Sequence, residues 1–372
     1  MATGEVSIGS DLERKKWLRE GLIQAASTSF WGPYTGKSSD AVIYQENNEG
    51  AAAGHTVVFD FSGKISGKAI KGKNQAYGNG EIKRKFSDKI TVERYRIPVD
   101  NGDKFDGVNI GDLSINEHSD SRAKLADLFI RWKDQMIFDA LQGGTTGNPS
   151  HIIETTTAGA FTYDDLLKIE TILKTGKGYT SGIKRAPLEP FRIEGGKSVW
   201  LVVLDSAQAA ALKGDAKYQS LVVQGDVRGA NNRVISGLIG KLGNLLIVEG
   251  PDFFGYTDGS GQFGLEDSEV EIAGLRQYDD LGVWSGQATF DEATANSRGL
   301  ILGQGACQTA FGKMPDYKFQ ESTDFGITSE SAVEYWTAAK RTNLKLEGGS
   351  VYKEAKISGL DYGVVALDMK HA

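Results

Sequence analysis

The sequence predicts an α+β fold, and three observations support this prediction. Strand-like segments do not alternate regularly with helices, as a doubly wound parallel sheet would require. A strongly amphipathic helical segment spans residues 119–142. A long polar, glycine-rich excursion separates two strand-like segments at 55–61 and 89–97. With 372 residues, the chain is long enough to form two or three lobes.

The composition is that of an ordinary globular protein, with 40% hydrophobic and 24% charged residues. The net charge of −7 argues against nucleic-acid binding by the whole surface, although a local basic patch is compatible with it. Cys307 is the single cysteine, so no intrachain disulfide can form, and we expect it to be a buried small side chain. No signal peptide or membrane-spanning apolar run is present, which predicts synthesis and assembly in a cytoplasm.

The N-terminal segment predicts an isolated helix on an extended arm. A capping box, Ser10-Asp-Leu-Glu13, opens the helix, and apolar residues recur at helical spacing until it ends before Ser27. Residues 31–54 look like a loop rich in Gly, Ser and Asn. We therefore expect residues 1–54 to find little to bury them within their own chain.

A protruding β-hairpin is predicted next, because two strand-like segments flank the polar excursion. Residues 63–94 hold nine basic and three acidic residues, a net charge of +6, so the rest of the chain carries −13. A basic arm on an acidic body could bind the acidic body of another copy. Binding of single-stranded nucleic acid is a weaker alternative, since only Tyr77 and Phe86 could stack on bases. A solvated loop without a partner is the third interpretation.

The clearest helix begins at Ser119 or Asp120 and runs to about Gln142, ahead of two glycines. Its length of about 36 Å and its single apolar stripe indicate a scaffold element. A cofactor-binding stripe is the less common alternative. The residues of the stripe are Leu125, Leu128, Phe129, Trp132 and Met136.

The rest of the chain mixes helices and strands. Helices are expected at 162–174, at 331–341, and from a cap at Asp205 or Ser206 to about Lys213. Residues 300–311 fit either a strand or a helix. Strands are expected at 198–204, 243–248, 269–273, 300–302, 353–357 and 363–367.

The motifs that would indicate catalysis are incomplete. Residues 31–38 resemble a phosphate loop, but Trp31 stands where that motif needs glycine, and Gly303-Gln-Gly305 lacks the third glycine of a dinucleotide site. No Gly-x-Ser-x-Gly is present, and no two of the four histidines have helical zinc-ligand spacing. The adjacent pair Asp164-Asp165 is better explained as charge at a helix N-terminus. We therefore expect no catalytic, cofactor-binding or metal site.

The order of these segments resembles the Hong Kong 97-type capsid fold of tailed bacteriophages, and more closely the major capsid family of coliphage N-four-type viruses. The likeness spans roughly residues 55–369 and depends on segment order. The segments are Gly67–Gly72, Ile90–Val99, Leu125–Leu141, Asn296–Gly303, Asp324–Ile327 and Asp361–Leu367. The glycine-rich stretch Tyr77–Gly80 departs from the family pattern, which has a more acidic, leucine-containing stretch there.

The resemblance implies five regions: an N-arm (1–54), an E-loop hairpin with its base (55–112), a P-domain with a spine helix (113–159), an A-domain (160–295) and returning P-domain strands (296–372). It implies a structural role, with hexamers and pentamers forming an icosahedral head around double-stranded DNA. Portal, scaffolding and decoration proteins are further implied partners. No cofactor and no membrane contact are implied.

The residues expected at interfaces between copies follow from this resemblance. The N-arm would contribute Trp17, Leu18 and Leu22, and the spine helix would pack through its apolar stripe. The E-loop would contribute Lys64, Lys68, Lys71, Lys73, Lys83, Arg84, Lys85 and Arg94. Two alternatives remain at this point: a polymer-degrading hydrolase with a carboxylate pair, and a decoration or tail binding module.

Overall fold

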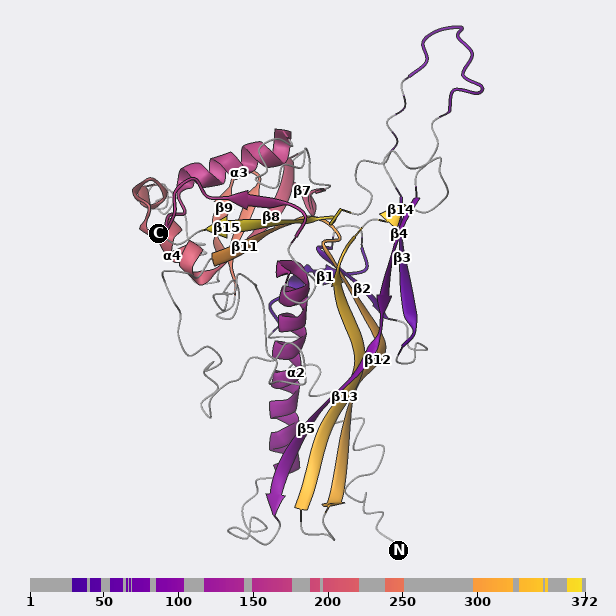
Figure 1. The fold of residues 1–372 in the computed structure, drawn as a ribbon, viewed down its shortest axis with the longest axis vertical. Helices are drawn as coiled ribbons and strands as arrows, with labels where there is room; N and C mark the ends of the chain where they lie inside the picture. Colours follow the sequence, from indigo (N-terminus) through magenta and orange to yellow (C-terminus); the bar gives the residue numbers. More distant parts are fainter. Residues whose placement is uncertain are drawn as a thin grey trace, which may run out of the picture.

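The fold was analysed in a computed structural model. It describes residues 29–38, 41–47, 54–62, 65, 67, 69–80, 85–103, 117–143, 149–175, 188–194, 197–220, 238–250, 297–323, 328–343, 345–346 and 360–369. Two sheets pack against one long helix, and a hairpin arm projects from beside the upper end of the five-stranded sheet, on the side away from the larger sheet (Figure 1). This is the α+β arrangement that the sequence predicts.

A five-stranded sheet forms the elongated lobe, in the order β1-β2-β12-β13-β5. Its long strands β5 (Glu93–Asp103), β12 (Cys307–Thr323) and β13 (Thr328–Arg341) are antiparallel neighbours. The short strands β1 (Thr35–Gly36) and β2 (Ile43–Asn47) extend the sheet beyond β12 in parallel pairing. One sheet therefore combines segments from the beginning, middle and end of the chain.

A larger mixed sheet forms the second lobe, in the order β6-β15-β11-β8-β10-β9, with β7 beside β8. Its central strands are β8 (Lys197–Leu204) and β11 (Ser297–Leu302), and all six residues of β11 are buried. Helices α3 (Tyr163–Thr175) and α4 (Ser206–Gly214) cover one face, where their apolar residues join a single core cluster with the sheet. The other strands are β6 (Ile152–Glu154), β7 (Arg192–Glu194), β9 (Leu238–Leu242), β10 (Leu245–Glu249) and β15 (Val364–Met369).

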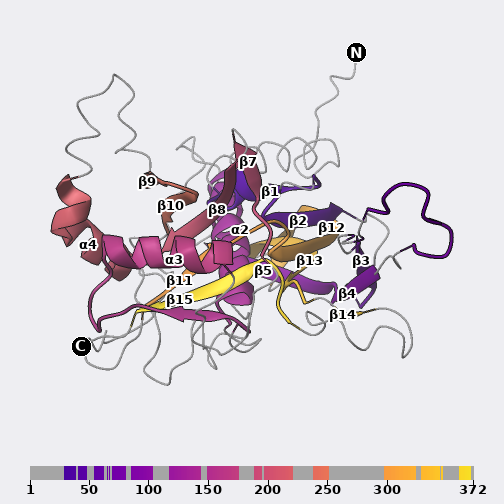
Figure 2. The same ribbon diagram turned by 90° about the horizontal axis from the view of Figure 1, so that it is seen from above.

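Helix α2 (Glu117–Gln142) links the two lobes, as Figures 1 and 2 show from two directions. Its N-terminal half packs on the five-stranded sheet through Leu125, Phe129 and Trp132. Its C-terminal half packs on the larger sheet through Ile137 and Leu141, on the face opposite α3 and α4. The helix begins two residues before the expected Ser119 and ends at the expected Gln142.

A third sheet carries the hairpin arm. Strands β3 (Thr56–Ser62) and β4 (Lys85–Thr91) are antiparallel, and β14 (Lys345–Leu346) adds two residues beside β4. The predicted hairpin is therefore present, but its second strand differs from the prediction. The expected strand over 89–97 is interrupted at Val92, so that its second half is β5 of a different sheet.

The expected helix over 331–341 is wrong, because these residues belong to strand β13. Helix-favouring residues such as Ala338 and Ala339 suggested the helix, but burial in this segment has a two-residue period. Val333 and Tyr335 face α2, whereas Trp336 and Ala338 contact the arm on the opposite face. Tertiary packing on two faces outweighs local helix propensity here.

Residues 300–311 form strands on both sides of a tight turn, which settles the ambiguity of this segment in favour of strands. Gly305 adopts a left-handed backbone conformation (φ 63°), and a Cβ at Gly303 would collide with the carbonyl oxygen of Glu189. These glycines therefore serve chain packing. The expected cap of a separate helix is also confirmed, since Asp205 accepts a hydrogen bond from the Ala207 amide at the start of α4.

Candidate inter-subunit interface

The tip of the hairpin arm is the most exposed described part of the molecule. All residues from Ala69 to Gly80 are exposed, and Tyr77 keeps 89% of its surface accessible. Ile65 and Ile70 are also large exposed hydrophobic residues, at 69% and 41%. An exposed apolar group without a core beneath it often marks a binding surface. Figure 1 shows this segment projecting beyond the two lobes.

The basic residues predicted for the arm fall in three groups. Lys71 and Lys73 lie in the exposed tip, and Lys85 is exposed at the start of β4. Arg94 lies outside the arm, on β5 in the five-stranded sheet, and its guanidinium forms an ion pair with Glu334 of the same chain. Four further residues lie outside the described part of the chain: Lys64, Lys68, Lys83 and Arg84.

Glu334 binds two basic residues on one face of the five-stranded sheet. Its side chain is only 2% exposed and lies between Arg94 and Lys318. Burial raises the pKa of this carboxyl, but hydrogen bonds and charge from Lys318 and Arg94 outweigh burial, so the net pKa is lowered. Arg94 is therefore committed to a contact within its own sheet.

The root of the arm is fixed to the five-stranded sheet by a buried carboxylate. Asp88, on β4, is 1% exposed. One of its oxygens forms an ion pair with Lys340 (2.5 Å), and the other accepts a hydrogen bond from the Asn343 amide (2.9 Å). The apolar residues Phe59 and Ile90 pack with Ala338 in the same region. The arm is therefore anchored by both packing and charge, and Asp88 was not identified from the sequence.

The N-terminal part of the chain is more closely integrated than the sequence predicts. Trp31 is fully buried in the core cluster between α2 and the larger sheet, with its ring centroid 4.7 Å from that of Phe138. The Ser29 hydroxyl and the Phe30 amide donate to the carboxylate of Asp134 on α2, at 2.7 and 2.6 Å. Residues 31–54 are therefore not all loop. The predicted interface residues Trp17, Leu18 and Leu22 lie outside the described residues.

The predicted apolar stripe of the long helix faces the five-stranded sheet. Leu125, Phe129 and Trp132 are buried there, and Leu128 and Met136 are partly buried against the same cluster. The aromatic rings of Trp132 and Tyr335 lie 4.9 Å apart. The stripe thus forms an ordinary protein core.

Two arginines hold the C-terminal end of α2, one from each large sheet. Arg298 of β11 donates to the Gln142 carbonyl (3.0 Å), and both oxygens of Asp368 bind its guanidinium at 2.6 and 2.7 Å. Arg341 of β13 donates to the Ala140 carbonyl (3.3 Å) and pairs with Asp361 (2.9 Å). Positive charge at a helix C-terminus is stabilising, so this two-arginine junction joins the lobes.

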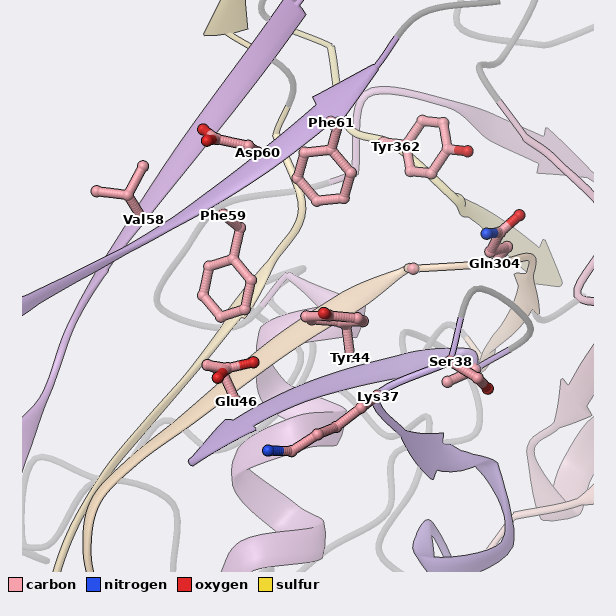
Figure 3. Close-up of a pocket in the computed structure, with 12 residues that line it drawn as sticks. Lys37, Ser38, Tyr44, Glu46, Val58, Phe59, Asp60, Phe61, Gln304 and Tyr362 are labelled. Carbon is pink, nitrogen blue, oxygen red and sulfur yellow. The ribbon is translucent and has the colours of Figure 1, made fainter. Parts of the chain in front are cut away.

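A groove of about 410 Å³ lies at the root of the arm, between β2 and β3 (Figure 3). Four aromatic side chains line it: Tyr44, Phe59, Phe61 and Tyr362. Burial raises the pKa of the Tyr362 hydroxyl to about 12, so the hydroxyl stays neutral at physiological pH. Charged residues border the groove at Lys37, Glu46 and Asp60, and Figure 3 shows the Asp60 carboxylate on the outer side of β3.

Within the described ranges, no cluster of three metal-ligating side chains is found. No helix in those ranges is long and apolar enough to cross a membrane. Cys307 is fully buried, and burial raises the pKa of its thiol to about 12, so it is not a reactive thiolate at neutral pH.

Comparisons with known proteins give a consistent result. Residues 5–160 match a family model described as phage capsid protein. The capsid structure of Helicobacter pylori bacteriophage KHP30 is similar with a TM-score of 0.68 and 17% identity, covering 100% of this chain and 95% of that chain. The capsid of Ralstonia phage GP4 gives 0.65 and 17%, covering 100% and 99%. Cyanophage Pam1 gives 0.62 and 12%, covering 100% of both chains. No curated protein matches the chain.

The fold is therefore that of Hong Kong 97-type phage capsid subunits. The family match over residues 5–160 covers less than half of the chain, and it agrees with this fold. Both findings support the prediction of a phage capsid protein, and neither favours the hydrolase or binding-module alternative.

Proposed function

We propose that this chain is the main building block of an icosahedral phage head, in which hexamers and pentamers enclose double-stranded DNA. The single observation that carries the proposal is the hairpin arm, whose root packs on the five-stranded sheet and whose tip, residues 69–80, is exposed throughout. Extended elements of this kind gain burial only in an assembly, where standard interfaces bury roughly 1,600 Å².

The proposed roles of the regions follow the arrangement of the two lobes. Residues 1–54 act as the N-arm and 55–112 as the E-loop and its base. Residues 113–159 and 296–372 supply the P-domain, and residues 160–295 supply the A-domain around capsomer axes. The larger sheet refines these boundaries, because strands β6, β11 and β15 from outside 160–295 complete it.

Charge supports contact between the arm of one copy and the body of another. Residues 63–94 carry +6 and the rest of the chain −13, so the arm is attracted to a neighbour's body.

We infer that the shell also engages portal and scaffolding proteins, and decoration proteins where present, and that packaged DNA is held without sequence specificity. Assembly in the host cytoplasm is part of this proposal.

Charge reversal of the arm tests the proposal. The triple variant Lys83→Glu, Arg84→Glu, Lys85→Glu should leave a folded protomer that fails to assemble, because its arm is repelled by the acidic neighbour. Negative-stain microscopy of the purified protein measures particle formation, and circular dichroism checks folding. The matched control is the charge-conserving variant Lys83→Arg, Arg84→Lys, Lys85→Arg, which should form normal particles.

Two outcomes would contradict the proposal. Normal shells from the charge-reversed variant would show that the arm is not held by charge. A wild-type protein that remains a monomer or small oligomer at all concentrations, without capsomers or shells, would contradict the role as a shell subunit itself.

A further inference from the structure

The tip and the root of the arm carry surfaces of complementary chemistry. At the tip, Tyr77 presents an aromatic ring that is 89% exposed, flanked in the sequence by the basic residues Lys71 and Lys73. No acidic residue lies between Ala69 and Gly80. The tip is therefore an aromatic group in a positively charged setting.

The groove at the root offers the opposite surface. Phe59, Phe61, Tyr44 and Tyr362 point into the space between β3 and β2, as Figure 3 shows. The Tyr44 and Phe59 rings lie edge to face at 5.7 Å, which leaves aromatic surface facing the groove. A groove of about 410 Å³ is large enough to admit an aromatic side chain, since small-molecule sites begin at about 300 Å³.

Acidic groups at the rim match the basic tip. Glu46 is half-buried on β2 and Asp60 is exposed on β3, and neither carboxylate has an ion-pair partner among the residues described. Lys37 lies on the same side of the groove as Glu46, as Figure 3 shows, and the charged lining residues sum to −1. One lysine at the β3 side would meet Asp60 and a second at the β2 side would meet Glu46, whereas both carboxylates would repel an acidic segment.

A tip cannot fill the groove of its own arm, because tip and groove lie at opposite ends of one hairpin (Figure 1). A contact between two different surfaces of identical copies is heterologous, and such contacts generate closed rings or continuous arrays. We propose that Tyr77 at the arm tip of one copy docks into the groove between β2 and β3 of the next copy, with Lys71 and Lys73 beside Glu46 and Asp60.

This inference depends on the proposed shell function and names the receptor site for its arm. Tyrosine is enriched among interface residues that dominate binding energy, above all where it fills a pocket. The Tyr77→Ser variant is expected to raise the protein concentration needed for assembly about tenfold or more. The folded protomer should be unaffected, since Tyr77 keeps 89% of its surface accessible.

Chemical cross-linking tests the contact directly. A chain carrying Ala76→Cys, beside an intact Tyr77, and Val58→Cys is assembled and treated with a short bis-maleimide, since Ala76 is exposed and Val58 borders the groove and is 51% exposed. Cys307 is fully buried and should not react. A ladder of covalent multimers is expected, because each copy has one tip and one groove and can therefore be joined to two other copies. The matched control pairs Ala76→Cys with Leu167→Cys, an exposed position on α3, and should give no ladder.

Charge exchange supplies the second test. Lys71→Glu with Lys73→Glu should block assembly, and Glu46→Lys with Asp60→Lys should block it as well. A chain that carries all four substitutions should assemble again, because acidic side chains at the tip then face basic side chains at the groove. Failure of this rescue, with all chains folded, would overturn the assignment of these partners.

The outcomes separate this inference from the proposed function. Shells that form normally without a cross-link ladder, or with equal cross-linking of the Leu167→Cys control, would overturn the docking of Tyr77 and leave the shell function intact. A wild-type chain that never forms shells would overturn the proposed function first.

Discussion

The C-terminal end of α2 and the tip of the hairpin arm both carry positive charge, but they are held in opposite ways. Arg298 and Arg341 are buried, and each is bound by a carboxylate and by a carbonyl of the helix. Lys71 and Lys73 are exposed and form no ion pair within the described ranges. The junction of the lobes is thus completed within the chain, whereas the tip is available to another copy.

This comparison predicts that substitutions will separate into two classes. Substitutions at the junction should change the free energy of unfolding, and substitutions at the tip should change assembly while leaving unfolding unchanged. The root of the arm lies between these extremes, because it is buried yet carries the exposed tip.

The largest effect on stability is expected for Arg298→Ala. Removing one partner of a buried ion pair leaves Asp368 uncompensated and the Gln142 carbonyl without its donor, which should cost about 3–5 kcal/mol. Thermal or denaturant unfolding measures the change. Arg298→Lys is the matched control: it keeps the charge and loses the bidentate geometry, so its cost should be smaller. A loss below about 1 kcal/mol for Arg298→Ala would contradict the importance of the junction.

An intermediate effect is expected for Asp88→Ala at the root of the arm. The Asn343 amide and Lys340 lose their acceptor, which should cost about 1–3 kcal/mol. Hydrogen exchange should accelerate in β3 and β4 more than in the larger sheet, because the arm loses its anchor while the junction remains. Asp60→Asn on the paired strand is the control, since that carboxylate is exposed. Uniform acceleration in both lobes would instead indicate that Asp88 supports the whole fold.

The smallest effect on unfolding is expected for Lys71→Glu combined with Lys73→Glu. Exposed residues without partners usually change stability by less than about 0.5 kcal/mol, so the melting temperature should stay near that of the wild type. The same variant should fail to assemble, which light scattering can measure. Lys71→Arg with Lys73→Arg is the control and should assemble. A clear loss of stability in the charge-reversed variant would show that the tip contacts its own chain.

Features set by local patterns were well predicted from the sequence. The apolar period of α2, the Asp205 cap and the apolar run 199–204 of β8 depend on spacing and on short-range hydrogen bonds, and the structure agrees with them. Features set by distant partners were missed. The 331–341 segment is a strand because β5 and β12 pair with it on its two edges, and Trp31 is buried because α2 lies beside it.

The sequence alone determined the α+β class, the long scaffold helix, the basic hairpin and the resemblance to tailed-phage capsid proteins. These depend on composition, periodicity and segment order, which a linear chain displays. Only the tertiary structure decided that Arg94 pairs within its own sheet, that Asp88 anchors the arm, and that a groove opens between β2 and β3. Each of these depends on residues that are distant in sequence, and the direction in which two such residues face each other is fixed only when their strands pack.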